Sequence, residues 1–289
     1  MTKLQDRPLI SINSLSLIFA GRNFEQQCRR AKQAGFTGIE YTVFYPELVS
    51  VYRAIARQNG LLLTLHQPWS YTESGGMLSN KLFAMLGLLP KDGYLLGDIA
   101  QHAAGESFVV YGDRFPEIAM RKALPGTPPR FVPLFQTASA WSGFGLQRKH
   151  RMSYEDFIRY IIEGLPHVGI VYDTVHALEL ALHAPTAKLL MQYSEGELLD
   201  ATKRVIRETR FFEGRGKEIH FNDFCGNGTD GRCLAGDGKL APALRWLAGE
   251  CVERGWRGPV IPEVSPMLFM FNAEKNLARV HDRIDSFFP

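Results

Sequence analysis

The apolar positions of the chain switch repeatedly between short runs rich in β-branched and aromatic residues and longer stretches with helical spacing. The short runs have the length of strands, and the longer stretches carry helix signals at their ends. Such alternation is typical of βα units, in which helices connect the strands of a parallel sheet. The runs that qualify as strands are residues 8–13, 37–44, 61–67, 107–112, 130–136, 168–173, 218–223 and 259–264.

Helical patterns with identifiable ends lie between these runs. Asn23 and Ser153 are the expected N-caps of two helices, and Pro46 opens another. The stretches are residues 23–35, 46–60, 153–164, 194–210, 239–255 and 272–288. Residues 72–105 are interrupted by Gly and Pro, and leave the helix limits there open. Eight strands alternating with helices predict an α/β fold, a single (β/α)8 TIM barrel over residues 1–289.

Composition narrows the class of protein. A chain of 289 residues with 45% apolar and 22% charged residues is ordinary for a globular protein, and a net charge of +3 does not favour a nucleic-acid partner. The four cysteines form no CxxC pair, so neither a disulfide framework nor a zinc finger is expected. No apolar stretch approaches the roughly 20 residues of a membrane span, and the first residues lack a signal-peptide pattern. We therefore expect a cytoplasmic protein with no membrane partner.

Polar residues recur where the predicted strands end, which in a barrel is the mouth where active sites are built. They are His66, Tyr111, Gln136, Asp173, His220 and Glu263. Imidazole and carboxylate groups around one point suit a divalent cation such as Zn, Mn, Fe or Mg, and Asp173, His220 and Glu263 can supply three ligands. Singly, a strand-end Asp often caps a helix and a lone His is often only hydrogen-bonded. The prediction of a metal site therefore depends on the whole set.

Two further segments lie beside this predicted mouth. His176 follows Asp173 by three residues, a spacing that fits either a second group at the mouth or a turn packed over the barrel end. Residues 224–240 are rich in Gly and Asn and predict a loop that carries Asp230 and Arg232. Its Gly-Asp-Gly at 236–238 lacks the spacing and the Lys of a phosphate-binding loop, so we interpret it as a turn.

These motifs together resemble the xylose isomerase-like TIM barrels, a superfamily of sugar epimerases and isomerases, dehydratases and apurinic endonucleases. The resemblance covers nearly the whole chain, through GFTGIEY, LHQP, YDTVHA, EIHFND followed by D-x-R-x-x-x-G-D-G, and GPVIPEV. For sugar-active members it implies a metal held by Glu, Asp, His and Glu of the fifth to eighth strands, which correspond to the Gln136 region, Asp173, His220 and Glu263. The fifth strand has no acid, and either Gln136 or Phe135 stands there. A Gln can offer a neutral carbonyl oxygen but cannot act as a base.

The apurinic endonucleases bind three metals, and the resemblance is weaker there. The matching residues are His66, Asp173, His176, His220, Asp230 and Glu263. Tyr111 and Arg232 stand where histidines are expected and the bridging Glu is missing, so a nuclease ranks last. Arg232 either pairs with Asp230 or binds a carboxylate or phosphate of a substrate.

The resemblance implies a metal-dependent isomerase or lyase, epimerase- or dehydratase-like, that takes one divalent metal ion and a small sugar-like or polyhydroxylated cyclic substrate. Glu263 is the candidate base, with His66 or His176 as the proton carrier. The candidate substrate contacts are Trp69, Tyr111, Arg232 and Asp230, although aromatic residues equally pack barrels. The alternative is a degenerate barrel that binds a ligand or protein partner without catalysis. Barrels of this kind often form homodimers, and the sequence leaves the oligomeric state open.

Overall fold

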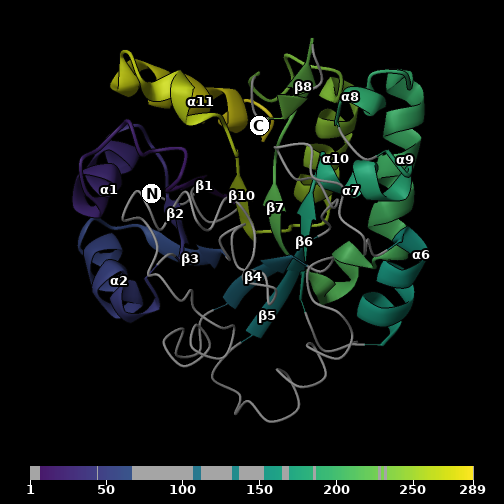
Figure 1. Cartoon of the computed structure of the whole chain (residues 1–289), viewed down its shortest axis with the longest axis horizontal. Helices are drawn as coiled ribbons and strands as arrows, with labels where there is room; N and C mark the ends of the chain where they lie inside the picture. Colours follow the sequence, from purple (N-terminus) through teal and green to yellow (C-terminus); the bar gives the residue numbers. More distant parts are fainter. Residues whose placement is uncertain are drawn as a thin grey trace, which may run out of the picture.

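The strands of the protein close into a parallel barrel surrounded by helices (Figure 1). The computed structural model describes residues 7–43, 45–66, 153–164, 169–184, 187–226 and 233–288, and the backbone of 107–111, 132–136 and 229–230. The barrel strands, each parallel to its neighbours, follow the order β1-β10-β7-β6-β5-β4-β3-β2. Their bounds are β1 (Leu9–Asn13), β2 (Gly38–Thr42), β3 (Leu62–His66), β4 (Ser107–Tyr111), β5 (Val132–Gln136), β6 (Gly169–Asp173), β7 (Gly216–His220) and β10 (Pro259–Ile261). The predicted α/β barrel is confirmed, whereas a single domain over residues 1–289 stays a prediction.

Two helices, α1 and α6, begin directly after the capping residues predicted for them. Asn23 and Ser153 accept hydrogen bonds from the backbone of Gln26 and Asp156, and Ser194 forms a capping box with Glu197. The helices are α1 (Phe24–Gln33), α2 (Val49–Gln58), α6 (Tyr154–Asp156), α7 (His176–Ala181), α8 (Ala187–Leu190), α9 (Glu195–Glu208), α10 (Ala241–Glu253) and α11 (Ala273–Asp285). A 3-10 turn (Pro46–Leu48) precedes α2, and a π-helix (Phe157–Glu163) continues α6. The short helices α7 and α8 were not predicted, because neither is long enough to show a helical period.

The interior of the barrel is unusually polar. In most (β/α)8 barrels branched apolar side chains fill this space. Here the register pairs Asn13 with Glu40 and Asp173 with His220. The buried polar side chains of the barrel strands are Ser11, Asn13, Glu40, Thr42, His66, Asp173, Glu218 and His220. Burying such groups costs free energy unless each finds a partner, so their contacts decide what the interior can do.

The seventh and eighth strands end earlier than predicted. β7 stops at His220 rather than at residue 223, and β10 stops at Ile261 rather than at residue 264. Asp223 leaves the ladder because its buried carboxylate binds the following loop. Its oxygens accept hydrogen bonds of 2.8–2.9 Å from the backbone N–H groups of Phe224, Gly236, Gly238 and Leu240. Asp223 thus joins the start of this loop to its end.

The Gly-Asp-Gly segment is a turn, as predicted, and its last glycine is required by close packing. A Cβ at Gly238 would lie 2.2 Å from the carbonyl oxygen of Phe224 and 2.4 Å from Oδ1 of Asp223. The same loop contains a small antiparallel hairpin of β8 (Phe224–Cys225) and β9 (Thr229–Asp230).

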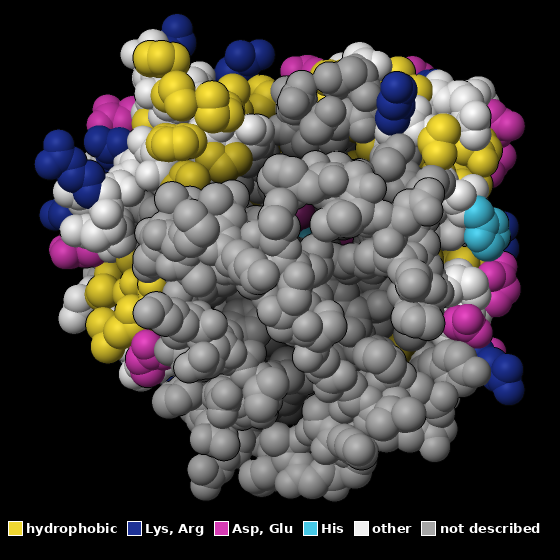
Figure 2. Space-filling view, viewed as in Figure 1, with side chains coloured by type: hydrophobic (Ala, Val, Ile, Leu, Met, Phe, Trp, Pro, Cys, Tyr) yellow, Lys and Arg dark blue, Asp and Glu magenta, His cyan; other side chains and the backbone are white. Residues whose placement is uncertain are grey.

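Hydrophobic side chains gather on the surface near the start of α11 (Figure 2). The segment between β10 and α11 carries exposed Met267, Met270 and Phe271, the last 75% exposed. Apolar surface of this kind is common at interaction sites, and the homodimer stays a prediction. Within the described ranges, no helix combines the length and apolar character that crossing a bilayer requires.

The hydrogen bonds of Asp223 predict a large effect on stability. We expect Asp223→Ala to lower the free energy of unfolding by about 2 to 4 kcal/mol, because buried backbone donors lose their charged acceptor. Urea unfolding followed by circular dichroism measures this change. Asp200→Ala, on the exposed face of α9, is the matched control and should stay within about 0.5 kcal/mol of the parent. Equal effects of the two substitutions would contradict the assigned role.

Candidate metal centre

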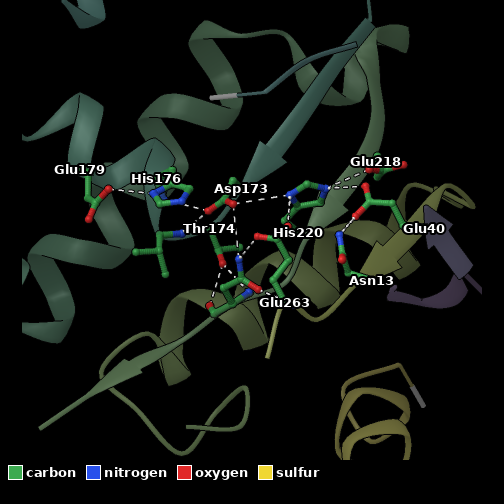
Figure 3. A network of polar contacts seen from close by, with 11 residues as sticks. Asn13, Glu40, Asp173, Thr174, His176, Glu179, Glu218, His220 and Glu263 are labelled. Carbon is green, nitrogen blue, oxygen red and sulfur yellow. Dashed lines mark hydrogen bonds and ion pairs between the residues drawn. The ribbon is translucent and has the colours of Figure 1, made fainter. Parts of the chain in front are cut away.

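Three predicted ligands meet at the mouth of the barrel. Asp173 ends β6, His220 ends β7, and Glu263 lies two residues beyond β10 (Figure 3). Nδ1 of His220 is 3.6 Å from Oδ2 of Asp173 and 3.6 Å from Oε1 of Glu263, and ligand atoms of all three lie within 4.8 Å of one another. Two ligands of a tetrahedral zinc ion, each bonded at about 2.1 Å, are separated by about 3.4 Å. The spacing and the donor types therefore fit a divalent cation.

Each of the two carboxylates turns one oxygen toward Nδ1 of His220, while its other oxygen accepts hydrogen bonds from protein donors. Oδ1 of Asp173 accepts the backbone N–H groups of Val175, at 3.0 Å, and His176, at 2.8 Å. Oδ1 of Asp173 therefore holds the turn that leads into α7, while Oδ2 faces the candidate site. Oε2 of Glu263 accepts a hydrogen bond of 3.2 Å from Nδ2 of Asn222, while Oε1 faces the imidazole.

Asn222 connects the ends of three strands beside the site. Its Nδ2 reaches Oδ2 of Asp173 at 3.4 Å as well as Glu263, and its Oδ1 accepts the backbone N–H of Glu263 at 2.8 Å. Its own backbone N–H donates to Oγ1 of Thr174 at 2.8 Å, and its carbonyl accepts from that hydroxyl at 2.7 Å. Sequence reasoning assigned no role to Asn222. A polar residue that directly follows a ligand-bearing strand was the available signal.

A second group lies deeper in the barrel, on the other side of His220. Nε2 of His220 is 2.9 Å from Oε1 of Glu218 and 3.3 Å from Oε1 of Glu40, and the rings of His66 and His220 lie 5.3 Å apart between centroids. Glu40, His66 and His220 also bring ligand atoms within 4.8 Å of one another. Sequence reasoning missed Glu40 and Glu218. The signal was an acid inside each β-rich run, and Glu218 precedes His220 by two residues and so shares its face.

One histidine cannot serve both groups. A neutral imidazole has one bare nitrogen and one N–H. The side chain of Glu263 is 26% exposed, whereas Glu40, His66 and His220 are all buried. The mouth group of Asp173, His220 and Glu263 is therefore the candidate cation site.

The pKa values of the buried side chains are shifted because the charged groups lie close together and away from solvent. Burial lowers the pKa of His220, but the charges of Glu263 and Glu40 and its contacts with Asp173 and Glu218 raise it well above its usual value. Burial raises the pKa of Asp173, but the neighbouring imidazoles of His176 and His220 outweigh it and lower the value to about 2. Burial and the negative charge of Glu40 raise the pKa of Glu218 to about 8. The crowding therefore favours the protonated forms of His220 and Glu218 and the ionised form of Asp173.

The two predicted proton carriers occupy different places. His66, only 2% exposed, belongs to the deeper group. His176 opens α7 and its side chain is 22% exposed. Its Nδ1 lies 2.8 Å from Oε2 of the buried Glu179, and its ring lies between Glu179 and Asp173 (Figure 3).

Several predicted site residues cannot be placed by their side chains. Trp69 and Arg232 lie outside the described residues, and only the backbone of Tyr111, Gln136 and Asp230 is described. The register pairs Gln136 with Val171, two residues before Asp173, and with Tyr111. The choice between Gln136 and Phe135 as the fifth-strand ligand stays open, and Gln136 and the four substrate contacts stay predictions.

Comparison with protein-family models and with curated protein sequences gives no match. Solved structures match along nearly the whole chain. D-allulose 3-epimerase from Methylomonas sp. is 12% identical with a TM-score of 0.58, covering 97% of both chains. The 3-keto-D-glucoside 4-epimerase of E. coli is 17% identical with a TM-score of 0.57, covering 96% of this chain and all of the other. The probable 3-DHS dehydratase AsbF from Bacillus anthracis is 11% identical with a TM-score of 0.57, covering 96% and 98%.

The chain has the fold of the xylose isomerase-like TIM barrels. The predicted resemblance is confirmed at the level of the fold. At these identities the likeness extends to the architecture, and what the epimerases and the dehydratase act on remains a property of those proteins.

The raised pKa of His220 predicts that cation binding to this xylose isomerase-like barrel depends on pH. A cation at Nδ1 must displace a proton, so the apparent affinity should rise by up to about tenfold per pH unit as pH increases toward the pKa of His220. Asp173, with its lowered pKa, stays ionised and adds nothing to this slope. Calorimetric titration with Mn²⁺ between about pH 6 and pH 8, in buffers of different ionisation enthalpy, should show about one proton released. A pH-independent affinity would contradict the assignment.

Asn222→Asp should make the stability of the protein depend on a cation. The substitution replaces a donor by an acceptor between Asp173 and Glu263, so with EDTA the free energy of unfolding should fall by about 2 to 4 kcal/mol. Mn²⁺ should stabilise this variant more than it stabilises the parent, because a third carboxylate then faces the ion. Asn222→Ala is the control, since it removes the same hydrogen bonds without adding charge. Equal responses of both variants to Mn²⁺ in thermal unfolding would rule out a position of Asn222 beside the cation.

Proposed function

We propose that the protein is a divalent-metal-dependent isomerase or lyase, epimerase- or dehydratase-like, that acts on a small sugar-like or polyhydroxylated cyclic substrate. The observation that carries the proposal is the position of Nδ1 of His220, 3.6 Å from an oxygen of Asp173 and 3.6 Å from an oxygen of Glu263. That two epimerases and a dehydratase have the same fold supports the proposal. One divalent ion, held by Asp173, His220 and Glu263 with Gln136 as a fourth ligand, would complete the site.

The residues at the mouth have separable roles in this proposal. When bound, the cation polarises an oxygen of the substrate and so acidifies the adjacent C–H bond. Glu263 is the most exposed carboxylate of the group and is oriented by Asn222, so it can approach that carbon as a base. His176 is the better placed proton carrier, because it is partly exposed while Glu179 holds one of its ring nitrogens. His66 is buried, and its ring lies beside that of His220, with 5.3 Å between the ring centroids.

Further parts of the proposal concern the surroundings of the site. We assign substrate contacts to Trp69, Tyr111, Asp230 and Arg232, all from segments that end or follow predicted strands at the mouth. The substrate is a small molecule. A cytoplasmic location, a homodimer and the absence of a nucleic-acid partner stay predictions.

Metal content tests the site directly. Protein purified without chelators should hold about one equivalent of Mn, Zn, Fe or Mg by elemental analysis. Asp173→Ala and His220→Ala should lose most of it, because each removes a ligand and leaves buried partners uncompensated. Asp200→Ala is the control and should keep its metal. Retention of the metal in both site variants would overturn the ligand assignment.

Proton transfer tests the reaction class without a known substrate. The metal-loaded protein is incubated in D2O with a panel of ketoses, aldoses and cyclic polyhydroxylated ketones, and NMR follows deuterium entering the carbon next to the carbonyl group or the loss of water. We expect exchange or dehydration with one member of the panel, dependent on the cation and lost in Asp173→Ala. A metal-loaded protein that binds panel members without exchange or dehydration would instead favour the non-catalytic ligand-binding barrel.

A further inference from the structure

We infer that Glu218 is a positioning residue that holds the Nε2–H of His220 and thereby presents Nδ1 to the cation. The inference rests on the proposed cation site of Asp173, His220 and Glu263. Oε1 of Glu218 lies 2.9 Å from Nε2, a hydrogen-bond distance, on the side of the ring opposite Asp173 (Figure 3).

The strand geometry makes this pairing local to β7. Glu218 and His220 are two residues apart, so both side chains point into the barrel, next to Val171 and Asp173 of β6. Both are buried. A carboxyl group enclosed in this way is costly unless it has a polar partner, and the imidazole of His220 supplies one.

Glu40 provides an internal comparison. It is buried like Glu218 and approaches the same nitrogen, but its Oε1 is 3.3 Å away and off the direction that a hydrogen bond needs. Its other oxygen is engaged by Nδ2 of Asn13. A single N–H has one good acceptor, and the geometry selects Glu218 rather than Glu40.

The hydrogen bond matters because the imidazole of His220 has two nitrogens and acidic side chains lie close to both of them. With Nε2–H donated to Glu218, the lone pair of Nδ1 points between Asp173 and Glu263 and the ring cannot rotate away from them. Hydrogen-bond acceptors at the second ring nitrogen orient metal-binding histidines, and their removal typically costs about 10- to 100-fold in metal affinity. Glu218 acts through His220 and does not itself contact the ion.

The test compares Co²⁺ binding by the parent with three variants. Glu218→Leu removes the acceptor, Glu218→Gln keeps a neutral amide oxygen in its place, and Glu40→Gln removes the neighbouring charge but leaves Glu218. By calorimetry we expect Glu218→Leu to bind about 10- to 100-fold more weakly, Glu218→Gln to be intermediate, and Glu40→Gln to stay within about threefold of the parent.

A proton NMR signal of His220 distinguishes a role of Glu218 in orienting the imidazole from a role in the stability of the protein. In the Co²⁺-loaded parent, the buried Nε2–H should give a paramagnetically shifted resonance that exchanges slowly with water. The resonance should persist in Glu218→Gln and in Glu40→Gln, and it should vanish through exchange in Glu218→Leu, although all remain folded by circular dichroism. His220→Gln identifies the resonance by its absence.

Each result has one meaning. A parent that binds no Co²⁺ would defeat the proposed function and this inference together. A parent that binds Co²⁺ while Glu218→Leu binds equally well, or keeps the resonance, would defeat the inference alone. Equal weakening by Glu40→Gln would also overturn it, because charge rather than the hydrogen bond would then be responsible. If Glu218→Leu does not fold, Glu218→Gln decides, and an affinity no weaker than that of Glu40→Gln overturns the inference.

Discussion

The arrangement of polar side chains inside this barrel depends on the contacts of the His220 imidazole. This ring is buried and has acids on both sides: Asp173 and Glu263 at Nδ1, and Glu218 and Glu40 at Nε2. Unpaired carboxylates in such a space would repel one another and pay a large desolvation cost. His220 reduces both effects, and the charges around it raise its pKa. The polar interior and the candidate site are therefore one electrostatic unit centred on a single ring.

Much of the architecture could be predicted because strand and helix patterns are local. Asn23 and Ser153 mark their helices by capping chemistry, and the strand runs alternate with the helices as a barrel requires. The end of β6 at Asp173 followed from the same pattern. The early end of β7 did not, because it depends on Asp223 binding backbone groups up to 17 residues further along the chain.

The candidate site could be predicted only in part. Asp173, His220 and Glu263 were found because each is a polar residue near the end of a predicted strand and because the family resemblance assigns a metal ligand to each of these strands. Glu40 and Glu218 were missed because the sequence around a charged residue inside a strand does not show which residue it contacts. Glu40 comes from β2, far in sequence from β7, so only the closed barrel shows that it approaches His220. Asn222 was missed for the same reason, since its partners lie at the ends of two other strands, β6 and β10.

The divided carboxylates at the mouth have a consequence for ion selectivity. One oxygen of Asp173 is committed to the start of α7 and one oxygen of Glu263 to Asn222, so each can offer a single oxygen to an ion. Calcium takes about six to eight oxygens and gains much of its affinity from two-oxygen chelation by a carboxylate. The candidate cation site offers no two-oxygen chelation by Asp173 or Glu263, and it contributes an imidazole nitrogen from His220. It therefore disfavours calcium and favours smaller ions that accept nitrogen ligands.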